Sequence, residues 1–327
     1  MKAVIIRQHG APDVLQVQGV AVPTPSAHQV LVRVIASGLN RADILQRKGF
    51  YPAPSGVPSD IPGLEYAGVV ESVGSDVTRC LPGDRVMGLV AGGSCAEFLV
   101  THEDLTLSIP PELDFIQASA LPEAFVTAYD AMVLQGGLQQ GGSVAITAAT
   151  SGVGTAAIQI ASAIDATAFG STRSKEKLTR LHELGLKHAV HGEAQELVQA
   201  IRSSATPEGV DVVVDLVAGP GLNTLLKGLR SQGTLVVVGL LGGAKTEVNL
   251  VQLLAKRALI RGTVMRSRSH EAKSDLMARV RLGLLPLFVE GKLKPVIDKV
   301  YPLAHAQAAH TELEANQHVG KIVFDHR

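Results

Sequence analysis

The sequence contains no tryptophan, and aromatic residues of all kinds make up only 3% of its 327 residues. Many proteins that bind single-stranded nucleic acid stack its bases on aromatic side chains, so this class of function is poorly supported. The chain also has no excess of charge of either sign, because 30 Lys and Arg residues are balanced by 30 Asp and Glu residues. A neutral chain offers no general attraction to nucleic acid or to an anionic membrane. We therefore expect neither partner.

Cysteine is scarce as well, with only Cys80 and Cys95. Two thiols argue against a disulfide-stapled scaffold and are typical of a reducing compartment. The first ten residues, MKAVIIRQHG, hold a short apolar run that Arg7 interrupts. A run this short predicts no signal peptide and no membrane span, so we expect a cytoplasmic protein.

Apolar residues are plentiful, at 46% of the chain, and 327 residues are enough for two domains with separate cores. Residues 1–120 consist of short apolar runs separated by Gly and Pro, which is typical of a compact β domain. Residues 121–267 open with a helical pattern at Pro122. They then alternate six strand-like runs with helical stretches. That alternation predicts an α/β domain with a doubly wound, six-stranded parallel sheet.

The last part of the chain, residues 268–327, does not continue the alternation. Residues 276–291 have the pattern of one amphipathic helix ended by Gly291, and the run KIVFD predicts a final strand. About sixty residues are few for an independent domain. We predict that they pack on residues 1–120 and make the first domain discontinuous.

The segment from Gly141 to Ala161, GGSVAITAATSGVGTAAIQIA, predicts a buried strand, a tight turn and the start of a helix. Free backbone amides at the first turn of such a helix bind a pyrophosphate. Compared with the fingerprint G-x-G-x-x-G, the three glycine positions are Ala149, Ser151 and Gly154. The fingerprint is therefore degenerate, and a plain strand-helix turn remains an alternative. As the nucleotide-binding residues of this turn we predict Ser151, Gly152, Val153 and Gly154.

The end of the second strand of this domain bears on the choice of nucleotide. An NAD-binding enzyme places a carboxylate there for the ribose 2′-hydroxyl, but this sequence reads STRSKEK from Ser171. Hydroxyl and cationic side chains suit a 2′-phosphate, so we predict NADPH, bound by Arg173, Ser174 and Lys177. The alternative is that these charges only form the solvated first turn of the next helix.

Two more strand ends lie at the carboxyl edge of the predicted sheet, where open α/β sheets bind ligands. Gly239 and Leu240 follow the fifth strand, and Met265 and Arg266 follow the sixth. We predict that all four contact the cofactor. Met265 as a core residue remains the alternative there.

Five motifs carry a resemblance that spans the chain. They are SGLNRADILQRKGFY from Ser37, PGLEYAGVVESVG from Pro62, ALPEAFVTAYDAM from Ala120, SGVGTAAIQ from Ser151 and EANQHVGKIVF from Glu314. Together they resemble the zeta-crystallin-like quinone oxidoreductases, a zinc-free branch of the medium-chain dehydrogenase/reductase superfamily. The resemblance implies a GroES-like β-barrel catalytic domain, residues 1–120 and 268–327, and a Rossmann NADPH-binding domain, residues 121–267.

Zinc-dependent members of this superfamily hold a catalytic metal with Cys and His. Here Asn40 stands near the position of the catalytic Cys, and Leu64 replaces the His of a Gly-His-Glu motif. Two cysteines cannot form a four-thiolate structural site, and no H-E-x-x-H is present. We predict no metal. Without a Lewis acid, hydride transfer to an ordinary ketone loses several kcal/mol of charge stabilisation in the transition state. A more reactive hydride acceptor, such as a quinone, is therefore implied.

The resemblance also assigns individual roles, with hydride transfer expected in the cleft between the two domains. It implies that Asn40 and Thr127 face the nicotinamide and that Asn316 reaches the cofactor. His191 stands where relatives often have Tyr near the adenosine. Tyr51 is the best candidate for a phenolic donor to the acceptor oxygen. The alternatives are structural roles: a turn for Asn40, a self-bonded helix residue for Thr127, a helix cap for Asn316 and a surface cover for Tyr51.

Other functions are compatible with the same residues. A reductase of enones or enoyl thioesters would share the zinc-free chemistry, and a non-catalytic, crystallin-like NADPH-binding protein would share the cofactor site. The sixth strand, in ALIRGTVM, lies at an edge of the predicted sheet. Pairing of that edge with its twin predicts a homodimer.

Overall fold

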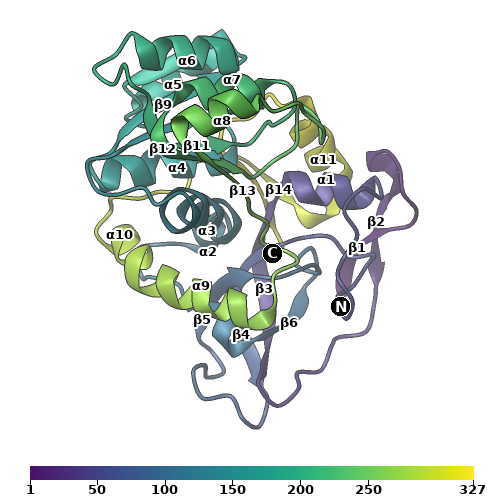
Figure 1. The fold of residues 1–327 in the computed structure, drawn as a ribbon. Coiled ribbons are helices and arrows are strands. Elements are labelled where there is room, and N and C mark those ends of the chain that lie inside the picture. The colour runs from purple at the N-terminus through teal and green to yellow at the C-terminus, as the bar shows by residue number, and fades with distance from the viewer. The chain divides into compact units, whose positions relative to one another are not determined.

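The computed structural model describes all 327 residues, and they form two compact units. The first unit comprises Met1–Glu123, Met265–Glu290 and Lys294–Arg327, and the second comprises Ala124–Val264 and Gly291–Leu293. Figure 1 shows both, coloured along the chain. None of the helices is long and apolar enough to cross a bilayer.

The first unit is built on a mixed seven-stranded sheet. Its order is β14-β15-β3-β4-β5-β7, with β6 paired to β3, and β1 and β2 form a separate antiparallel pair. β15 pairs with β3, so the end of the chain completes a sheet begun near its start. The strands are β1 (Lys2–Ile6), β2 (Leu15–Gly19), β3 (Gln29–Leu39), β4 (Glu65–Val73), β5 (Arg85–Leu89), β6 (Phe98–His102), β7 (Thr106–Ser108), β14 (Ile297–Pro302) and β15 (Lys321–Asp325).

Short helices surround this sheet. They are α1 (Arg41–Arg47), α2 (Phe115–Ser119), α9 (His270–Gly283), α10 (Leu285–Val289) and α11 (Ala306–Ala315), with 3₁₀ turns η1 (Pro12–Val14), η2 (Glu103–Leu105) and η5 (Leu303–His305). One core joins both ends of the chain, because Val4 and Leu15 pack with Leu313 and Phe324. Burial of apolar side chains is therefore what holds the returning tail to the first unit.

The single helix predicted for residues 276–291 is wrong. The structure has two helices there, α9 ending at Gly283 and α10 starting at Leu285. Pro286 explains the break, since its ring has no N–H to donate and clashes with a continuing helix on its N-terminal side. At the second position of the new helix α10, the missing N–H is not needed.

The second unit contains the predicted doubly wound sheet. Its six strands are all parallel, in the order β10-β9-β8-β11-β12-β13. They are β8 (Ser143–Ile146), β9 (Thr167–Thr172), β10 (His188–His191), β11 (Val210–Asp215), β12 (Leu229–Val237) and β13 (Leu259–Gly262). From β8 to β10 the strands are added toward one edge of the sheet, and from β11 to β13 they are added toward the other edge. The switch point between β8 and β11 is where such sheets bind ligands.

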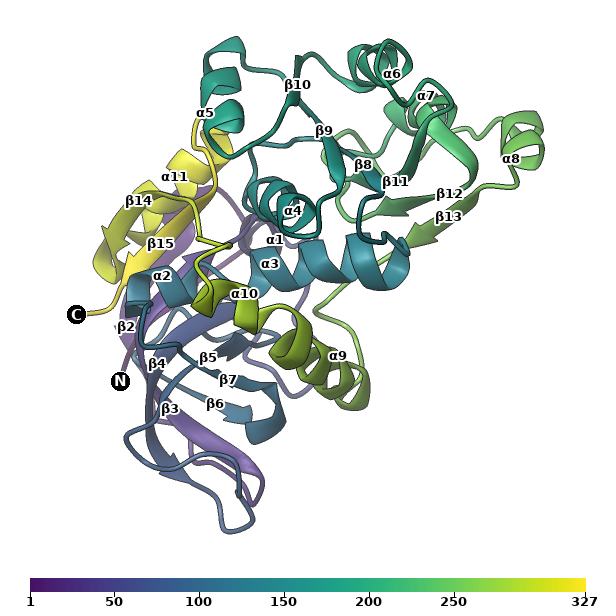
Figure 2. The ribbon, with the colours of Figure 1, turned by 90° about the vertical axis from the view of Figure 1, so that its left-hand side faces the viewer.

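Helices cover both faces of this sheet, as Figure 2 shows. The crossover helices are α4 (Gly152–Ala163), α5 (Leu178–Glu183), α6 (Ala194–Arg202), α7 (Gly221–Gly228) and α8 (Leu250–Lys256), with the 3₁₀ turn η4 (Lys175–Lys177) before α5. The core on one face joins α6 and α7 to the central strands, with Leu197, Leu225 and Val213 in contact. α3 (Pro122–Tyr129) continues as the π-helical turn η3 (Asp130–Gln135).

Candidate functional site

The start of α4 has the geometry of an anion site. Ser151 is its N-cap, and the Ser151 hydroxyl accepts a hydrogen bond from the amide of Gly154 at 3.1 Å. The first backbone bond of the helix runs from Thr155 N–H to Ser151 O, so the amides of Gly152 and Val153 precede it. A Cβ at Gly154 would lie 2.6 Å from Ala149 O, so glycine alone allows α4 to pack this close to the strand end. The amides left over are those that bind phosphate oxygens.

The end of β9 places hydroxyl and cationic groups one strand away. Ser171 and Thr172 are buried, whereas Arg173 is exposed. The amide of Ser174 donates to Thr172 Oγ1 at 3.3 Å, and its hydroxyl donates to Glu176 at 2.7 Å. That bond lowers the pKa of the Glu176 carboxyl.

His191, at the end of β10, lies next to this strand end, with Nε2 3.2 Å from Arg173 O. The predicted residues Arg173, Ser174 and His191 therefore share one surface, and Lys177 follows in η4. Their contact with a nucleotide stays a prediction.

The ends of β11 and β12 come together through close backbone packing. A Cβ at Gly239 would lie 2.5 Å from Leu216 O, and Gly242 donates its amide to Val217 O at 2.7 Å. Leu240, by contrast, is 57% exposed. At the end of β11, Asp215 accepts the Thr147 hydroxyl with Oδ1, whereas its buried Oδ2 has no partner. Nothing in the sequence singles out Asp215, because it is one carboxylate at the end of an apolar run.

The side chain of Thr127 has the unsatisfied hydrogen-bonding group expected of a residue that contacts a ligand. Its hydroxyl is buried in α3 and has no hydrogen-bond partner. A helical Thr usually bonds a carbonyl one turn earlier, and leaving the hydroxyl unpaired is unfavourable. An orphaned hydroxyl, the leading amides of α4 and the tight glycines fit a bound dinucleotide in this unit.

Tyr51 and Arg266, which the sequence places in different predicted roles, meet within the first unit. The Arg266 guanidinium is buried and donates to Tyr51 O at 2.9 Å, Ala91 O at 2.6 Å and Gln46 Oε1 at 2.7 Å. It also lies 5.1 Å from the centre of the Tyr51 ring. All three guanidinium nitrogens thus bind protein groups, so Arg266 holds the Tyr51 loop in place. Its predicted contact with the cofactor is not shown by these bonds and stays a prediction.

Asn40 belongs to a buried polar cluster that the sequence did not reveal. Its Nδ2 donates to Glu65 Oε1 at 2.9 Å, and its Oδ1 accepts from the Lys321 ammonium at 2.5 Å. Lys321 and Glu65 form an ion pair at 2.6 Å, with side chains 5% and 0% exposed. A buried pair needs such extra hydrogen bonds to be tolerated. The side-chain groups of Asn40 are therefore engaged within the protein, and its contact with the nicotinamide stays a prediction.

Two further carboxyl groups lie near this cluster. Asp43 accepts the amides of Asn40 and Gly63, both at 2.8 Å, and burial raises its pKa to about 6. The amide of Glu123 donates to Glu65 at 2.7 Å. Burial and then the nearby Glu65 charge raise the pKa of Glu123 to about 8, so this carboxyl holds its proton at neutral pH. The sequence holds one indication that these charged residues are buried, because Asp43, Glu65 and Lys321 each interrupt or adjoin an apolar run. It does not indicate that they lie together.

Glu123 also lines a cavity of about 30 Å³ in the first unit, together with Leu64, Met265, Arg266 and Lys273. That volume holds about one water molecule. Burial, followed by the Glu123 charge, raises the pKa of the Tyr51 phenol, so Tyr51 stays protonated as a donor. Met265 is only 7% exposed and is mainly a core residue.

Asn316 caps a helix. It follows α11 with a φ of 56°, its amide donates to Leu313 O at 3.3 Å, and its Oδ1 accepts from Arg41. Asn tolerates this left-handed backbone better than most residues do. A second role toward a cofactor stays a prediction.

Comparison with known proteins gives the family. A model described as "Alcohol dehydrogenase GroES-like domain" matches residues 26–117, and one described as "Zinc-binding dehydrogenase" matches residues 152–280. A quinone oxidoreductase of Rattus norvegicus is 33% identical, covering 99% of this chain and 97% of its own length. The human quinone oxidoreductase is 31% identical with the same coverage.

Solved structures agree. Escherichia coli quinone oxidoreductase, crystallised with NADPH, has a TM-score of 0.89 and 27% identity, over 99% of this chain and 100% of that one. CurK enoyl reductase has a TM-score of 0.87 and 29% identity, over 99% and 98%. These likenesses support NAD(P)-dependent oxidoreduction as the activity. The chain belongs to the quinone oxidoreductase family of the medium-chain dehydrogenase/reductase superfamily.

Proposed function

We propose that this protein reduces quinones with NADPH by hydride transfer that needs no zinc. The observation that carries the proposal is the full-length likeness to quinone oxidoreductases, one of them crystallised with NADPH. The proposed nucleotide site lies in the second unit and the proposed acceptor groups lie in the first.

The second unit supplies the groups for NADPH. Amides of Gly152 and Val153 at the start of α4 would bind the pyrophosphate, as helix N-termini do. Arg173 and Lys177 would bind the 2′-phosphate, because strand β9 itself does not end in a carboxylate. The Ser174 hydroxyl, which donates to Glu176 in this structure, would turn to the phosphate. The unpaired Thr127 hydroxyl would bond the nicotinamide amide. When bound, NADPH supplies the hydride.

The first unit supplies a donor for the acceptor oxygen. Arg266 fixes the backbone at Tyr51, and the raised pKa of the phenol keeps it protonated. A phenolic O–H aimed at a quinone oxygen stabilises the negative charge that develops there as hydride arrives. Tyr51 therefore binds and orients the acceptor while keeping its own proton.

Reduction of a quinone by one hydride leaves an oxyanion that needs one proton to become a hydroquinone. Glu123 is a partly buried acid of the first unit, and with a pKa of about 8 it still carries a proton at pH 7. Its position beside the small cavity and its electrostatic effect on Tyr51 make it the source we propose for that proton. Solvent restores it afterwards.

Zinc independence rests on the residues at the expected metal position. Asn40 and Leu64 stand where zinc-dependent relatives have ligands, and neither is a metal ligand of the required kind. The Lys321 ammonium lies between Asn40 and Glu65, so a cationic group already neutralises that carboxylate. A quinone also needs less polarisation than a ketone.

Stopped-flow loss of NADPH absorbance with 1,4-benzoquinone tests the proposal. We expect turnover in chelator-treated protein, and a preference for NADPH over NADH that Arg173→Gln with Lys177→Gln reduces about 10- to 100-fold. Arg180→Gln, an exposed α5 position paired with Glu183, is the matched control and should leave the preference unchanged. Absence of turnover with any small quinone would overturn quinone reduction and favour a non-catalytic NADPH-binding protein.

A second candidate is reduction of an enone or enoyl thioester, favoured by the likeness to CurK enoyl reductase. The same Tyr51 phenol would then face a carbonyl conjugated to an alkene. Comparing kcat/KM for 2-alkenals and quinones separates the two, because the better acceptor has the higher value.

A further inference from the structure

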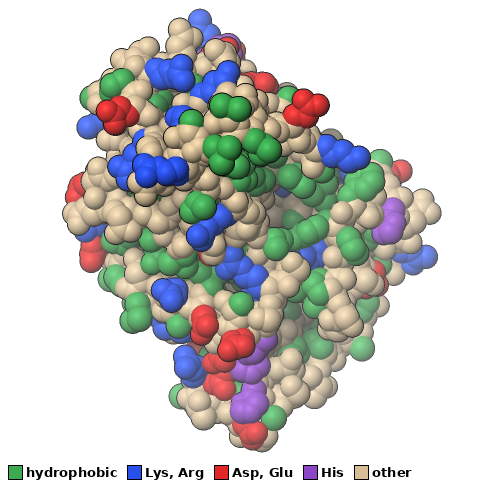
Figure 3. Space-filling model, in the orientation of Figure 1, with side chains coloured by type: hydrophobic (Ala, Val, Ile, Leu, Met, Phe, Trp, Pro, Cys, Tyr) green, Lys and Arg blue, Asp and Glu red, His purple; other side chains and the backbone are tan.

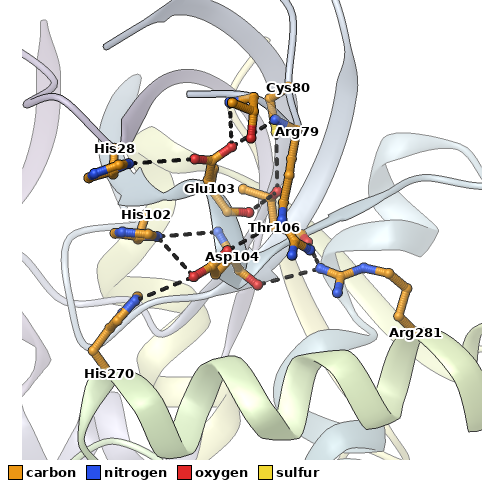
Figure 4. A network of polar contacts seen from close by, with 10 residues as sticks. His28, Arg79, Cys80, His102, Glu103, Asp104, Thr106, His270 and Arg281 are labelled. Carbon is orange, nitrogen blue, oxygen red and sulfur yellow. Dashed lines mark hydrogen bonds and ion pairs between the residues drawn. The ribbon is translucent and has the colours of Figure 1, made fainter. Parts of the chain in front are cut away.

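Three potential metal ligands meet on the surface of the first unit, away from Tyr51 and the Asn40 cluster. His102 ends β6, Asp104 lies in η2 and His270 is the first residue of α9. One ligand atom from each lies within 4.8 Å of the other two. Figure 4 shows the Asp104 carboxylate between the two rings, and Figure 3 shows histidine and acidic side chains grouped on this part of the surface.

The carboxylate is held so that one oxygen faces both histidines. Asp104 Oδ1 pairs with Arg79 Nε at 3.5 Å, whereas Oδ2 lies 3.6 Å from His102 Nδ1 and 3.7 Å from His270 Nε2. Arg281 donates to Asp104 O in η2 at 3.4 Å and to Thr106 O, just after η2, at 2.9 Å, so it holds this segment in place. Side chains that are already oriented lose little entropy when they bind an ion.

The rings approach each other closely, with centroids 4.1 Å apart and tilted by 53°. Two protonated imidazoles at this distance would repel each other, so a double ion pair to Asp104 does not explain the arrangement. Nδ1 of His102 now accepts the Asp104 amide at 3.3 Å, a long bond that a metal at this atom would replace.

We propose that His102, Asp104 and His270 form a site for a divalent transition-metal ion of the zinc type. Two imidazole nitrogens and one carboxylate oxygen are a donor set that Zn²⁺, Co²⁺ and Ni²⁺ accept, with water in the remaining positions. His28 and Glu103 are neighbours outside the set. His28 stacks on His102 at 5.8 Å, and Glu103 accepts the amides of Thr78 and Arg79.

The ion would join the start of α9 to η2. One turn further along α9, Lys273 donates to Arg266 O at 2.8 Å, and Arg266 holds the Tyr51 loop. This site would be structural, and it is separate from the residues proposed for NADPH and quinone. It departs from our sequence-based prediction of no metal, which considered only the zinc sites of the superfamily and H-E-x-x-H.

Equilibrium dialysis of the full chain against Zn²⁺, after chelator treatment, with metal measured by mass spectrometry, tests the site. We expect one ion per chain and a rise in Tm on binding. His270→Ala and Asp104→Asn should each weaken binding by at least about 10- to 100-fold. His28→Ala, which removes a neighbouring histidine outside the set, should retain the ion.

Co²⁺ in place of Zn²⁺ gives a second readout. We expect visible d–d bands that disappear in His102→Ala, with no thiolate charge-transfer band, because Cys80 and Cys95 are not ligands. His270 is 49% exposed at its side chain, so His270→Ala should fold even if His102→Ala does not. Failure of wild-type protein to bind Zn²⁺, or unchanged binding by His270→Ala, would overturn the proposal.

Discussion

At the scale of single residues, the chemistry proposed for the first unit depends on protons held in place. Tyr51 and Glu123 both have a raised pKa, for the shared reason that burial disfavours their charged forms. Neither environment is visible from neighbours in the sequence, since Glu65, Arg266 and Lys321 come from distant segments.

Tyr51→Phe removes the phenolic donor while keeping the ring beside Arg266. We expect kcat/KM for a small quinone to fall roughly 100-fold, as when one oxyanion donor is lost, with NADPH affinity unchanged. Stopped-flow kinetics and fluorescence titration measure the two quantities. Tyr301→Phe in β14 is the matched control, and a change within about twofold in Tyr51→Phe would contradict the assigned role.

Glu123→Gln tests the raised pKa of this carboxyl through stability. A carboxyl whose pKa rises from 4.5 to about 8 on folding binds more protons in the folded state, so stability is present at low pH and lost as pH rises toward 8. Asp43 adds a similar loss at lower pH, ending near its pKa of about 6. Between pH 6 and 8 we expect wild type to lose roughly 1 kcal/mol per pH unit more than Glu123→Gln.

Urea denaturation at several pH values measures this difference. Glu112→Gln, an exposed glutamate of the same unit, should follow wild type. Parallel stability curves for wild type and Glu123→Gln would show that Glu123 titrates normally in the folded protein.

At the scale of elements, the nucleotide site depends on how closely α4 approaches β8. A Cβ on residue 154 would meet two backbone oxygens, Ala149 O at 2.6 Å and Ala148 O at 2.7 Å. Backbone atoms cannot rotate away as side chains do, so α4 itself must shift. The positive φ of Ala148, 46°, shows that this turn is already constrained.

Gly154→Ala should therefore displace the leading amides of α4. We expect a lower Tm, consistent with the roughly 1–3 kcal/mol typical of overpacking, and at least about tenfold weaker NADPH binding. Calorimetry measures both. Gly19→Ala in β2, where an added Cβ meets nothing within 4 Å, is the control. Normal NADPH affinity in Gly154→Ala would remove α4 from the proposed site.

At the scale of the whole molecule, β13 presents an open edge. It is the last strand of the six-stranded sheet, and Leu259 and Ile260 are 49% and 37% exposed. α8 beside it exposes Val251 and Leu254 at 75% each. Natural proteins cover or charge such edges, so we propose that a second copy pairs with β13 in a homodimer.

Light scattering after gel filtration measures the assembly. We expect a dimer mass for wild type and a monomer mass for Leu259→Asp. The introduced carboxylate would repel the same carboxylate of the second copy across the two-fold axis. Leu282→Asp, at an 82% exposed leucine of α9, should remain dimeric. A monomeric wild-type protein would contradict strand pairing.

The sequence alone determined the features that depend on near neighbours. Alternating apolar runs and helical stretches predicted the six-stranded parallel sheet, because burial on both faces requires continuous apolar strands. Glycines and Ser151 predicted the turn before α4, and Asn40 and Leu64 argued against a catalytic zinc. Local rules failed where Pro286 was overlooked, and one helix became two.

Only the tertiary structure decided which distant charges meet. Lys321 pairs with Glu65, Arg266 holds Tyr51, and His270 joins His102 and Asp104. These contacts join residues far apart in the chain, and periodicity carries no information about which side chains packing brings together. Burial by surrounding segments also changes the pKa of Glu123 and Asp43, so their protonation is a property of the folded chain.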